Sequence, residues 1–516
     1  MNLVPISPEA PFCAMAALIR AHAQHQPQRP ALCDDLYELS YAQLDALMDR
    51  VAAALQHEGV LPGQVIAICA LSSVRYAALF LGALRAGVVV APLAPSSTRD
   101  SLRAMLQDAE AQWLFLDKAA QELVPTDMAG LRCVSLDGEA TGLGFEDWLA
   151  PEGTQPQAVD ITPGAPFNII YSSGTTGTPK GIVQSHGMRW AHVRRGNAYN
   201  YSPDGRTLLA TPLYSNTTLV VFFPTLAFGG CVQLMAKFDA ARYLQLAEKH
   251  GVTHTMLVPV QYQRIMALPQ FGEHDLSAFR FKFCTSAPFS AALKADVLTR
   301  WPGGLVEFYG MTEGGGSCIL AAHEHPDKLH TVGRPAEGHD IRLIDEEGRE
   351  VGGSEAGEVV GHSAGMMTAY HGQPEKTREA EWFDTQGKRF IRTGDVGRFD
   401  TDGFLTLIDR RKDMVISGGF NIYPSDLEAQ LRGHPAVDDV AVVGVPSPQW
   451  GETPVAFVVP RAGAAGEAHD ILAWYNQRAG KTQRLASLYF IHELPRSAIG
   501  KVLKRELRDR YEAGTS

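Results

Sequence analysis

The sequence predicts an α/β protein with a large N-terminal body and a smaller C-terminal domain. Over roughly the first 400 residues, amphipathic helical stretches alternate with short runs of branched apolar residues, which is typical of mixed sheets covered by helices. Near residue 340 the segments become short and turn-punctuated, a pattern that favours antiparallel strands. A compact α/β segment follows a charge cluster at residues 409–413. These three observations predict the fold class.

Apolar spacing predicts the N-terminal elements. Residues 41–59 form an amphipathic helix that ends at a glycine. Its buried face carries Leu44, Leu47, Val51 and Leu55. Short apolar runs of this kind also predict buried strands, which we expect at residues 64–69, 88–93 and 254–259.

The C-terminal part begins after the charge cluster. We place the boundary at Lys412, which divides the chain into residues 1–411 and 412–516. Before it, Gly348 and Gly403 mark turns between short strands. After it, Ser425 and Glu428 have the spacing of a capping box and predict the start of a helix. Strands are expected to follow at residues 440–445 and 455–459.

The composition excludes several functional classes. The 516 residues contain 46 Lys and Arg and 57 Asp and Glu, a formal net charge of −11, so nucleic-acid binding is not expected. The most apolar stretch contains Arg85 and Gly87, so no membrane span is predicted. We see no signal peptide. The seven cysteines form no C-x-x-C pair, which favours a reducing compartment over a disulfide framework or a zinc site. We therefore expect a cytoplasmic protein.

Residues 171–181, YSSGTTGTPKG, follow an apolar strand and have the composition of a phosphate-binding loop. Backbone N–H groups of glycines and small hydroxyl residues can surround an anion, and Lys180 adds a positive charge. The segment is not the common nucleotide P-loop, because Pro179 stands where that motif requires glycine. Taken alone, a tract of this composition is more often a flexible surface loop.

Three further segments carry polar residues suited to nucleotide chemistry. Glu313 follows an apolar segment and, beside Thr312, could bind Mg²⁺ shared with phosphate oxygens. Asp395 follows Arg-Thr-Gly and could accept hydrogen bonds from two ribose hydroxyls. Lys501 stands on a loop after a glycine. Each residue alone has a plainer explanation: an exposed glutamate, a turn aspartate and a solvated lysine.

The order and spacing of these segments resemble the adenylate-forming superfamily, which includes acyl- and aryl-CoA synthetases, peptide-synthetase adenylation domains and beetle luciferases. The resemblance extends from about Leu39 to Leu507 and rests on YSSGTTGTPKG, YGMTE, VGRP, RTGDVGRFDTDGFLTLIDRRKD, SGGFNIYPSDLE and PRSAIGK, in the family's order. It implies a large N-terminal body of mixed sheets sandwiched with helices, a small β-barrel-like subdomain, and a smaller, mobile C-terminal α+β domain.

The resemblance also implies a two-step ligase, most like the acyl- and aryl-CoA ligases. A carboxylate attacks the α-phosphorus of ATP to give acyl-AMP and pyrophosphate, and a thiol then displaces AMP. The implied cofactors are ATP, Mg²⁺ and coenzyme A. The implied partners are a small carboxylic acid and the thiol of coenzyme A or of a carrier protein, and the protein would be a monomer or a homodimer.

Carried over position by position, the resemblance assigns most site residues. Catalytic roles fall on Lys501, Thr312 and Glu313, with Glu313 also the metal ligand. Lys412 would be the hinge about which the C-terminal domain rotates between half-reactions. The nucleotide-binding residues would be Ser172, Ser173, Gly174, Thr175, Thr176, Gly177, Lys180, Ser286, Ala287, Pro288, Tyr309, Gly310, Asp395 and Arg410. The loop lining the thiol tunnel would be Ser417, Gly418, Gly419 and Phe420.

Residues 212–218 depart from the family pattern and bear on the acyl substrate. Ser215 replaces a histidine and Thr218 a glycine, so the histidine's gating role does not carry over. Hydrogen bonding to the local backbone is an equally good interpretation of Ser215. The stretch also lacks the aspartate that would pair with the α-ammonium of an amino acid, so an amino-acid substrate is not expected. The acyl pocket should include Tyr214, Ser215, Asn216, Phe222, Phe289, Gly314, Gly315 and Gly316, where three glycines leave room for a ring or a medium chain.

The leading prediction is a ligase that joins an aryl or medium-size acyl acid to coenzyme A. The alternatives are an acyl-AMP ligase that loads a carrier-protein phosphopantetheine, a fatty-acid CoA ligase, and a non-catalytic acyl or nucleotide binding module. The presence of Lys180, Glu313, Asp395 and Lys501 argues against a non-catalytic module. Light emission is possible within the family, but no residue favours it.

Overall fold

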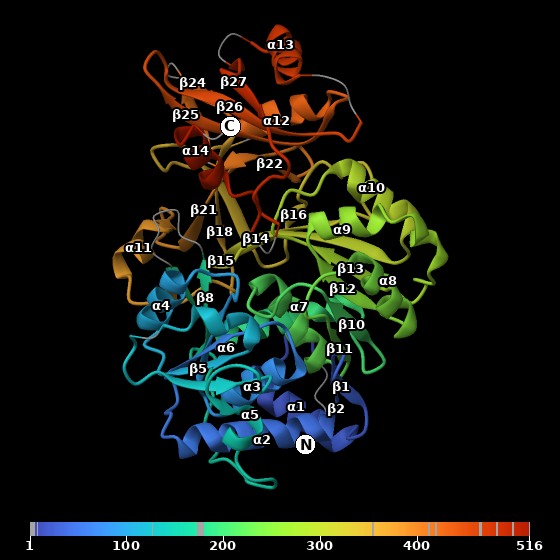
Figure 1. The fold of residues 1–516 in the computed structure, drawn as a ribbon, viewed down its shortest axis with the longest axis vertical. Coiled ribbons are helices and arrows are strands. Elements are labelled where there is room, and N and C mark those ends of the chain that lie inside the picture. The colour runs from blue at the N-terminus through green and yellow to red at the C-terminus, as the bar shows by residue number, and fades with distance from the viewer. Residues whose placement is uncertain are drawn as a thin grey trace. The chain divides into compact units, whose positions relative to one another are not determined.

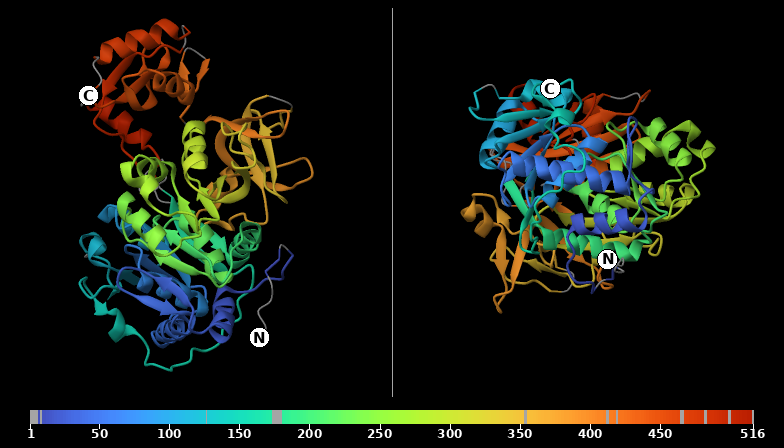
Figure 2. Two further views of the ribbon diagram at one scale, coloured as in Figure 1. Left: turned by 90° about the vertical axis from the view of Figure 1, so that its right-hand side faces the viewer. Right: turned by 90° about the horizontal axis from the view of Figure 1, so that it is seen from below.

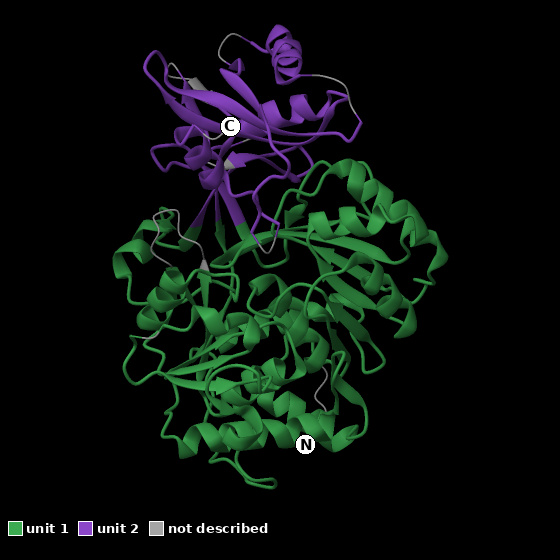
Figure 3. Ribbon diagram, viewed as in Figure 1, with its two compact units in different colours: residues 1–340, 361–391 green, residues 341–360, 392–516 purple. Residues whose placement is uncertain are grey.

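A computed structural model of the chain (Figure 1) describes residues 6–7, 9–125, 127–172, 180–352, 355–410, 413–417, 420–463, 467–480, 483–497 and 500–514. The backbone divides into two compact units, one of residues 1–340 and 361–391 and the other of residues 341–360 and 392–516 (Figure 3). Each unit has a hydrophobic core of its own. The chain therefore passes from one unit to the other more than once.

A nine-stranded sheet and an eight-stranded sheet form the framework of the first unit. The nine strands are β1 (Pro30–Cys33), β2 (Glu38–Ser40), β10 (Arg206–Leu209), β11 (Cys231–Leu234), β12 (His254–Leu257), β13 (Phe281–Cys284), β14 (Gly304–Met311), β15 (Gly314–Ala321) and β16 (Arg334–Pro335). Their order is β16-β15-β14-β13-β12-β10-β11-β1-β2. The strands from β14 to β1 run parallel, whereas β15, β16 and β2 pair antiparallel with their neighbours.

The eight-stranded sheet likewise combines parallel strands with antiparallel strands at its edge. Its strands are β3 (Val65–Cys69), β4 (Val89–Leu93), β5 (Trp113–Leu116), β6 (Arg132–Ser135), β7 (Leu143–Gly144), β8 (Pro166–Ser172), β9 (Lys180–Ser185) and β19 (Ala369–Tyr370). The order is β19-β9-β8-β4-β3-β5-β6-β7. The strands from β8 to β7 are parallel, and β9 and β19 pair antiparallel at one edge. Both sheets are therefore mixed, as the sequence predicts.

Helices cover these sheets. The α-helices of the first unit are α1 (Met15–His25), α2 (Tyr41–His57), α3 (Val74–Arg85), α4 (Arg99–Asp108), α5 (Phe145–Trp148), α6 (His186–Arg195), α7 (Asn216–Ala227), α8 (Ala240–Lys249), α9 (Pro259–Met266), α10 (Ala291–Arg300) and α11 (Pro374–Glu379). Three short 3₁₀ helices are η1 (Lys118–Leu123), η2 (Gly196–Tyr199) and η3 (Pro269–Glu273). Among the described residues, no helix has both the length and the apolar character needed to cross a bilayer.

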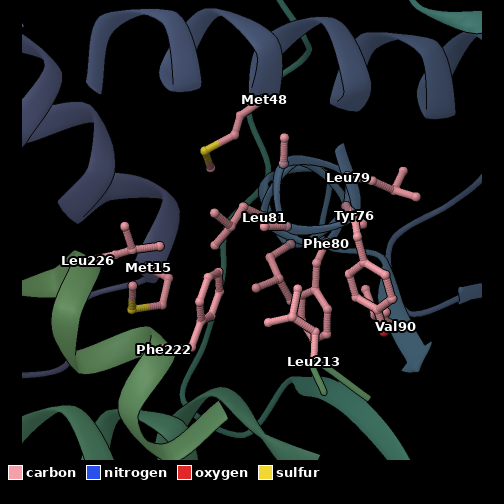
Figure 4. Packing of buried hydrophobic residues seen from close by; sticks show 14 of the residues in the cluster. Met15, Met48, Tyr76, Leu79, Phe80, Leu81, Val90, Leu213, Phe222 and Leu226 are labelled. Carbon is pink, nitrogen blue, oxygen red and sulfur yellow. The ribbon is translucent and has the colours of Figure 1, made fainter. Parts of the chain in front are cut away.

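The core of the first unit surrounds α3, whose residues are all buried except Arg75. Figure 2 shows α2 and α3, in blue, side by side. They approach closely because Gly82 has no side chain: a Cβ there would lie 2.5 Å from the Cβ of Val51. In Figure 4, Leu81 of α3 meets Met15 of α1 and Phe222 of α7. Four helices thus share one apolar cluster.

A five-stranded sheet is built from strands of residues 340–410. It contains β17 (Asp340–Ile344), β18 (Gly357–His362), β20 (Glu381–Phe383), β21 (Arg389–Phe399) and β22 (Leu405–Arg410). The order is β17-β18-β21-β20, and β22 also pairs with β21. Strand β21 pairs antiparallel with both β20 and β22, as expected from the turn-rich sequence. Gly348 and Gly403 have φ values of 79°, which suits the predicted turns.

A second five-stranded sheet forms the C-terminal part. Its strands are β23 (Val415–Ser417), β24 (Phe420–Ile422), β25 (Val437–Ser447), β26 (Gly451–Pro460) and β27 (Ser487–Phe490), ordered β24-β23-β26-β25 with β27 on β26. The helices are α12 (Pro424–Arg432), α13 (Ala468–Arg478) and α14 (Lys504–Glu512). Alternate residues of β25 and β26 enter two separate apolar clusters, because successive side chains of a strand point to opposite faces.

The structure confirms several element predictions and corrects two. The helix predicted from residue 41 is α2, which Ser40 caps in a capping box. The strand predicted over 254–259 ends at Leu257, since Pro259 begins α9. The capping box predicted at Ser425 is wrong: the helix begins at Pro424, and the Ser425 hydroxyl donates to the carbonyl of Ile408. The boundary predicted at Lys412 lies outside the described residues and stays a prediction.

Candidate active site

The predicted phosphate loop spans the end of one hairpin. Ser172 ends β8 opposite Lys180, which begins the antiparallel strand β9. The intervening loop, which holds Ser173, Gly174, Thr175, Thr176 and Gly177, lies outside the described residues. The Lys180 ammonium lies 5.2 Å from the ring centroid of Tyr370. The hairpin therefore holds the two ends of the loop together and places the lysine against an aromatic ring.

A second hairpin presents the predicted catalytic pair. Met311 of β14 pairs with Gly314 of β15, so Thr312 and Glu313 form a two-residue connection, called here the hairpin turn. The Tyr370 hydroxyl donates to Oε1 of Glu313 at 2.8 Å. Burial, followed by the nearby Glu313 carboxylate, raises the pKa of Tyr370, so its hydroxyl stays protonated and able to donate. Tyr370 thus contacts both Glu313 and the lysine of the phosphate loop.

The glycines after Glu313 have a structural role in addition to the one predicted from the sequence. Gly314, Gly315 and Gly316 have φ values of 81°, 67° and 97°, a region that favours glycine. A Cβ at Gly314 would overlap the carbonyl oxygen of Gly365, and one at Gly315 would lie 2.7 Å from Cβ of Ile391. Gly314 and Gly315 therefore permit close backbone packing of the hairpin and do not simply leave room for a substrate.

A buried polar network supports the hairpin turn. Gln184 of β9 donates to the carbonyl of Thr312 at 2.7 Å and, more weakly, to Asn216 at 3.4 Å. Asn168 donates to Gln184 at 3.0 Å, and Arg189 of α6 donates to both Asn168 and Gln184. Burial lowers the pKa of Arg189 to about 9, so it remains a cation at neutral pH. The network connects the turn to β8, β9, α6 and α7.

The residues predicted to hold adenine lie at the ends of neighbouring strands. Segment 286–288, with Ala287 half-buried and Pro288 exposed, follows β13, and Tyr309 and Gly310 lie near the end of the parallel strand β14. Ser286 has a φ of 81° and its hydroxyl lies 2.6 Å from that of Thr217. A non-glycine residue in this region is strained, which is common at functional sites. Parallel strands bring both segments to one edge of the sheet.

The predicted acyl-pocket residues are buried or half-buried. Ser215 caps α7 by accepting the N–H of Thr217 at 3.3 Å, the local role that the sequence left open. Tyr214 is half-buried, and Phe289 is buried and stacked on Tyr262 with centroids 5.2 Å apart. Phe222 belongs to the core cluster around α3, where it lies near Met15 of α1 (Figure 4), and its place in the acyl pocket stays a prediction.

The remaining predicted residues lie in the second unit. Asp395 pairs with Arg410 between β21 and β22, and the Asp395 N–H donates to Thr393 at 3.0 Å. Ser417 is buried and pairs with Phe420 and with Gly451. Lys412, Gly418 and Gly419 lie outside the described residues.

Lys501 lies in the second unit, where backbone contacts connect it to Ser497. Its N–H donates to the Ser497 hydroxyl at 3.2 Å, and its carbonyl accepts the Ser497 N–H at 2.8 Å. Arg496 donates to the carbonyl of Gly500 at 2.8 Å. These backbone contacts fix the position of Lys501 relative to its own loop.

Comparison with protein families decides the identity. A family model described as AMP-binding enzyme matches residues 19–371, more than half of the chain, and one described as AMP-binding enzyme C-terminal domain matches residues 426–501. This chain belongs to the AMP-binding enzyme family. The fold of mixed sheets and helices described above is that of its adenylate-forming relatives.

Individual relatives of this AMP-binding enzyme have several substrates in their names. Feruloyl-CoA synthase of Amycolatopsis sp. is 34% identical over 95% of this chain and 97% of that protein. The fatty acid–[acyl-carrier-protein] ligase ScoC of Streptomyces coeruleorubidus is 32% identical over 95% of each chain. The ATP-bound crystal structure of MatB from Rhodopseudomonas palustris matches with a TM-score of 0.86 at 28% identity, covering 97% of this chain and 100% of that one.

Sequence reasoning missed three residues of this AMP-binding enzyme that contact predicted site residues or support them. Tyr370 contacts Glu313, Gln184 holds the Thr312 carbonyl, and Arg189 holds Gln184. The sequence did not distinguish Arg189 from the other arginines of α6, Arg194 and Arg195. No motif singled out Tyr370, since the strand that carries it, β19, has only two residues.

Proposed function

We propose that this chain is an ATP-dependent acid–CoA ligase that acts on an aryl or medium-size acyl carboxylate. In the first step a carboxylate oxygen of the acid attacks the α-phosphorus of ATP, and the bond to the bridging oxygen breaks to release pyrophosphate. In the second step the coenzyme A thiolate attacks the acyl carbon, and AMP leaves. The observation that carries the proposal is Tyr370, which contacts both Lys180 and Glu313 and joins the phosphate loop to the hairpin turn.

The chemistry of the turn suits Mg²⁺. This ion usually takes one or two carboxylates together with substrate phosphates and water. Tyr370 contacts Oε1 of Glu313, and the second oxygen, Oε2, would take the ion. The described residues contain no group of three or more His, Cys, Asp or Glu side chains placed to hold a metal, which fits an ion held mainly through phosphates. When bound, Mg²⁺ would supply positive charge to the phosphates.

The other roles follow the family resemblance. Thr312 would contact the α-phosphate, and Lys180 would bind the β- and γ-phosphates with the loop. Lys501 would stabilise the charge that develops between the carboxylate and the α-phosphate. The remaining proposed contacts are adenine by Ser286, Ala287, Pro288, Tyr309 and Gly310, ribose by Asp395 and Arg410, and the thiol tunnel by 417–420, with Lys412 as the hinge.

Two further points belong to the proposal. The name of the feruloyl-CoA relative supports an aromatic acid and coenzyme A as substrates, whereas the ScoC relative makes a carrier-protein thiol the second candidate. All seven cysteines are free thiols, which supports a location in the cytoplasm.

A substrate screen tests the proposal. ATP–pyrophosphate exchange would be measured over benzoates, hydroxycinnamates and fatty acids, and AMP release would be followed with coenzyme A or with a carrier protein. We expect exchange with aromatic acids, AMP as the nucleotide product, and thiol-dependent turnover with coenzyme A. Release of ADP, or no exchange with any acid, would rule out the ligase.

A further inference from the structure

A carboxylate beside the phosphate loop connects three segments of the first unit. Asp108 is the last residue of α4, which lies next to the end of β8 (Figure 1), and its side chain is half-buried. Oδ2 of Asp108 accepts the hydroxyl of Tyr171 at 2.7 Å, and Oδ1 accepts the Nε2–H of Gln373 at 3.3 Å. Nδ1 of His371 lies 3.8 Å from Oδ2. Asp108 thus contacts one residue of β8 and two residues that follow β19.

The position of Asp108 does not stabilise its own helix. A helix C-terminus carries partial negative charge, so a carboxylate placed there is unfavourable. The last turn of α4, residues 105–108, carries no basic side chain that would offset the carboxylate. The contacts outside α4 therefore account for a carboxylate at this position, whereas the helix itself does not.

The contact with Tyr171 lies at the base of the phosphate loop. Tyr171 pairs with Gly181 of β9, and the next pair along the hairpin contains Ser172, where the loop begins. Burial, followed by the hydrogen bond to Asp108, raises the pKa of Tyr171, so its hydroxyl stays protonated and donates. A Cβ at Gly181 would lie 3.1 Å from Oδ2 of Asp108 and 3.1 Å from Cε1 of Tyr171. The carboxylate therefore packs directly against both strands of the hairpin.

The same carboxylate holds the segment that carries Tyr370. The N–H of His371 donates to the carbonyl of Gly181 at 2.7 Å, and the N–H of Gln373 donates to the carbonyl of Tyr370 at 3.2 Å. The side chain of Gln373 then reaches Asp108. Tyr370 contacts both the lysine of the phosphate loop and the glutamate of the hairpin turn. Asp108 therefore links the base of the loop to the residue that joins the loop to the hairpin turn.

We propose that Asp108 is a positioning residue for ATP: through Tyr171 and Gln373 it holds the phosphate loop in place relative to Tyr370. This inference rests on the proposed ligase function and goes beyond it, because it gives α4 a part in binding the β- and γ-phosphates. Asp108 acts through its partners and takes no part in either bond-making step. An ionised carboxylate only accepts hydrogen bonds, so its two oxygens can serve both donors, whereas asparagine would turn an N–H toward one of them.

Kinetics of the separate steps test the assignment. The β- and γ-phosphates are present during adenylation and absent from acyl-AMP. We therefore expect Asp108→Ala to raise the KM for ATP in pyrophosphate exchange at least about tenfold, since two hydrogen bonds to a charged group are lost. Thiolysis of supplied acyl-AMP should change by less than about twofold, and Asp108→Asn should give an intermediate KM. An equal loss in both steps would overturn the positioning role, because general damage to the fold affects both.

Tyr171→Phe tests the hydrogen bond itself, since it keeps the ring and removes only the hydroxyl. The KM for ATP should rise in this variant as well, by at least about threefold. The double variant Asp108→Ala/Tyr171→Phe should be no more impaired than Asp108→Ala alone, because both changes remove the same contact. Independent effects that multiply in the double variant would show that Asp108 does not act through Tyr171.

Asp204 offers a matched control. Its carboxylate also accepts one hydroxyl, from Ser202 at 2.6 Å, and one side-chain N–H, from Arg280 at 2.6 Å. It precedes β10 and therefore lies at the amino end of a parallel strand, whereas ligands of such sheets bind at the carboxyl ends. Asp204→Ala should leave the KM for ATP unchanged. Thermal unfolding of every variant would verify that it folds.

Equilibrium binding separates the two proposals. Magnesium-ATP and AMP would be titrated by calorimetry into the full chain without acid. We expect Asp108→Ala to weaken ATP binding at least about tenfold and AMP binding less than about twofold. If the wild type activates no acid but shows this selective loss, the positioning role stands and the ligase falls. If acids are activated and Asp108→Ala weakens ATP and AMP equally, or weakens neither, the positioning role falls and the ligase stands. If the wild type does not bind ATP, both proposals fall.

Discussion

Tyr370 shows how one residue can organise a site to which no motif assigns it. Its hydroxyl donates to Glu313, and its ring lies under the Lys180 ammonium. A hydrogen bond of this kind fixes which carboxylate oxygen is left for a metal ion, as the residues behind metal ligands commonly do. In the proposed mechanism, Tyr370 would therefore be a positioning residue.

Tyr370→Phe keeps the ring and removes only the hydroxyl. A hydrogen bond to a charged group contributes about 1.5–3 kcal/mol, so we expect pyrophosphate exchange to fall at least tenfold and the Mg²⁺ concentration for half-maximal rate to rise. Tyr475→Phe is the control, since its hydroxyl donates to the Gln483 carbonyl in the second unit. An unchanged Mg²⁺ dependence would refute the positioning role.

His254 makes the stability of the first unit depend on pH. It is fully buried, stacks on Tyr201 at 4.3 Å, and lies 2.7 Å from the carbonyl of Tyr199. Burial lowers its pKa to about 4. In the unfolded chain this histidine therefore binds a proton near pH 6.5, whereas in the folded chain it does so only near pH 4. Its contribution to the free energy of unfolding is complete above pH 6.5 and is lost as the pH falls toward 4.

We expect the free energy of unfolding to fall by up to about 3 kcal/mol through this one histidine between pH 6.5 and pH 4. His254→Gln should reduce the pH dependence, because the amide can donate to the same carbonyl without titrating. Urea unfolding followed by tryptophan fluorescence at pH 7 and pH 4.5 measures the difference. His469→Gln, at an exposed site in the second unit, should behave as wild type. Parallel pH curves for His254→Gln and wild type would contradict the assignment.

At the scale of elements, local patterns predicted the interiors of helices and strands better than their ends. Apolar periodicity located α2, and Ser40 supplied a cap that the local sequence encodes. The end of β12 depended on Pro259, which suits the first turn of a helix as well as the end of a strand. The cap expected from Ser425 failed because its hydroxyl donates to the carbonyl of Ile408 in β22, a tertiary contact that spacing does not contain.

The β14–β15 hairpin should tolerate no side chain at Gly314. Gly314→Ala would combine a left-handed φ with overlap of the Gly365 carbonyl. Gly338→Ala is a matched control, since Gly338 has a φ of 74° and open space around it. We expect Gly338→Ala to lower the free energy of unfolding by about 1–2 kcal/mol, the cost of the backbone conformation alone. Gly314→Ala should lower it by at least twice as much and should also abolish pyrophosphate exchange. Equal losses in urea unfolding would show that the overlap does not matter.

At the scale of the whole molecule, the contacts missed from sequence join distant segments. The phosphate loop and hairpin turn were predicted because each is a short, continuous stretch of unusual composition. Tyr370 lies far along the chain from both Lys180 and Glu313, yet contacts both of them. Such groupings arise from sheet order, which no single window of sequence contains.

Because the chain folds into two units, we predict that substitutions in the second unit can affect adenylation and thioester formation separately. Lys501→Ala should lower pyrophosphate exchange by about 10²–10³, the usual effect of removing one preorganised charge-stabilising contact. Thiolysis of supplied acyl-AMP should change by less than about threefold, and changes within residues 417–420 should give the reverse pattern. Lys118→Ala, at an exposed site, should affect neither reaction. Equal loss of both reactions in Lys501→Ala would contradict the assignment.

The division into two units has a consequence for how the protein can be made and dissected. The chain leaves the first unit after residue 340, returns for residues 361–391 and then leaves again. During synthesis the first unit is therefore complete only once residue 391 has been made. By then residues 341–360 of the second unit have been made, but the rest of that unit has not. A truncation at Lys412 would leave residues 341–360 and 392–411, which belong to the second unit, on the N-terminal fragment. Isolating either unit therefore requires joining its separate segments or circular permutation.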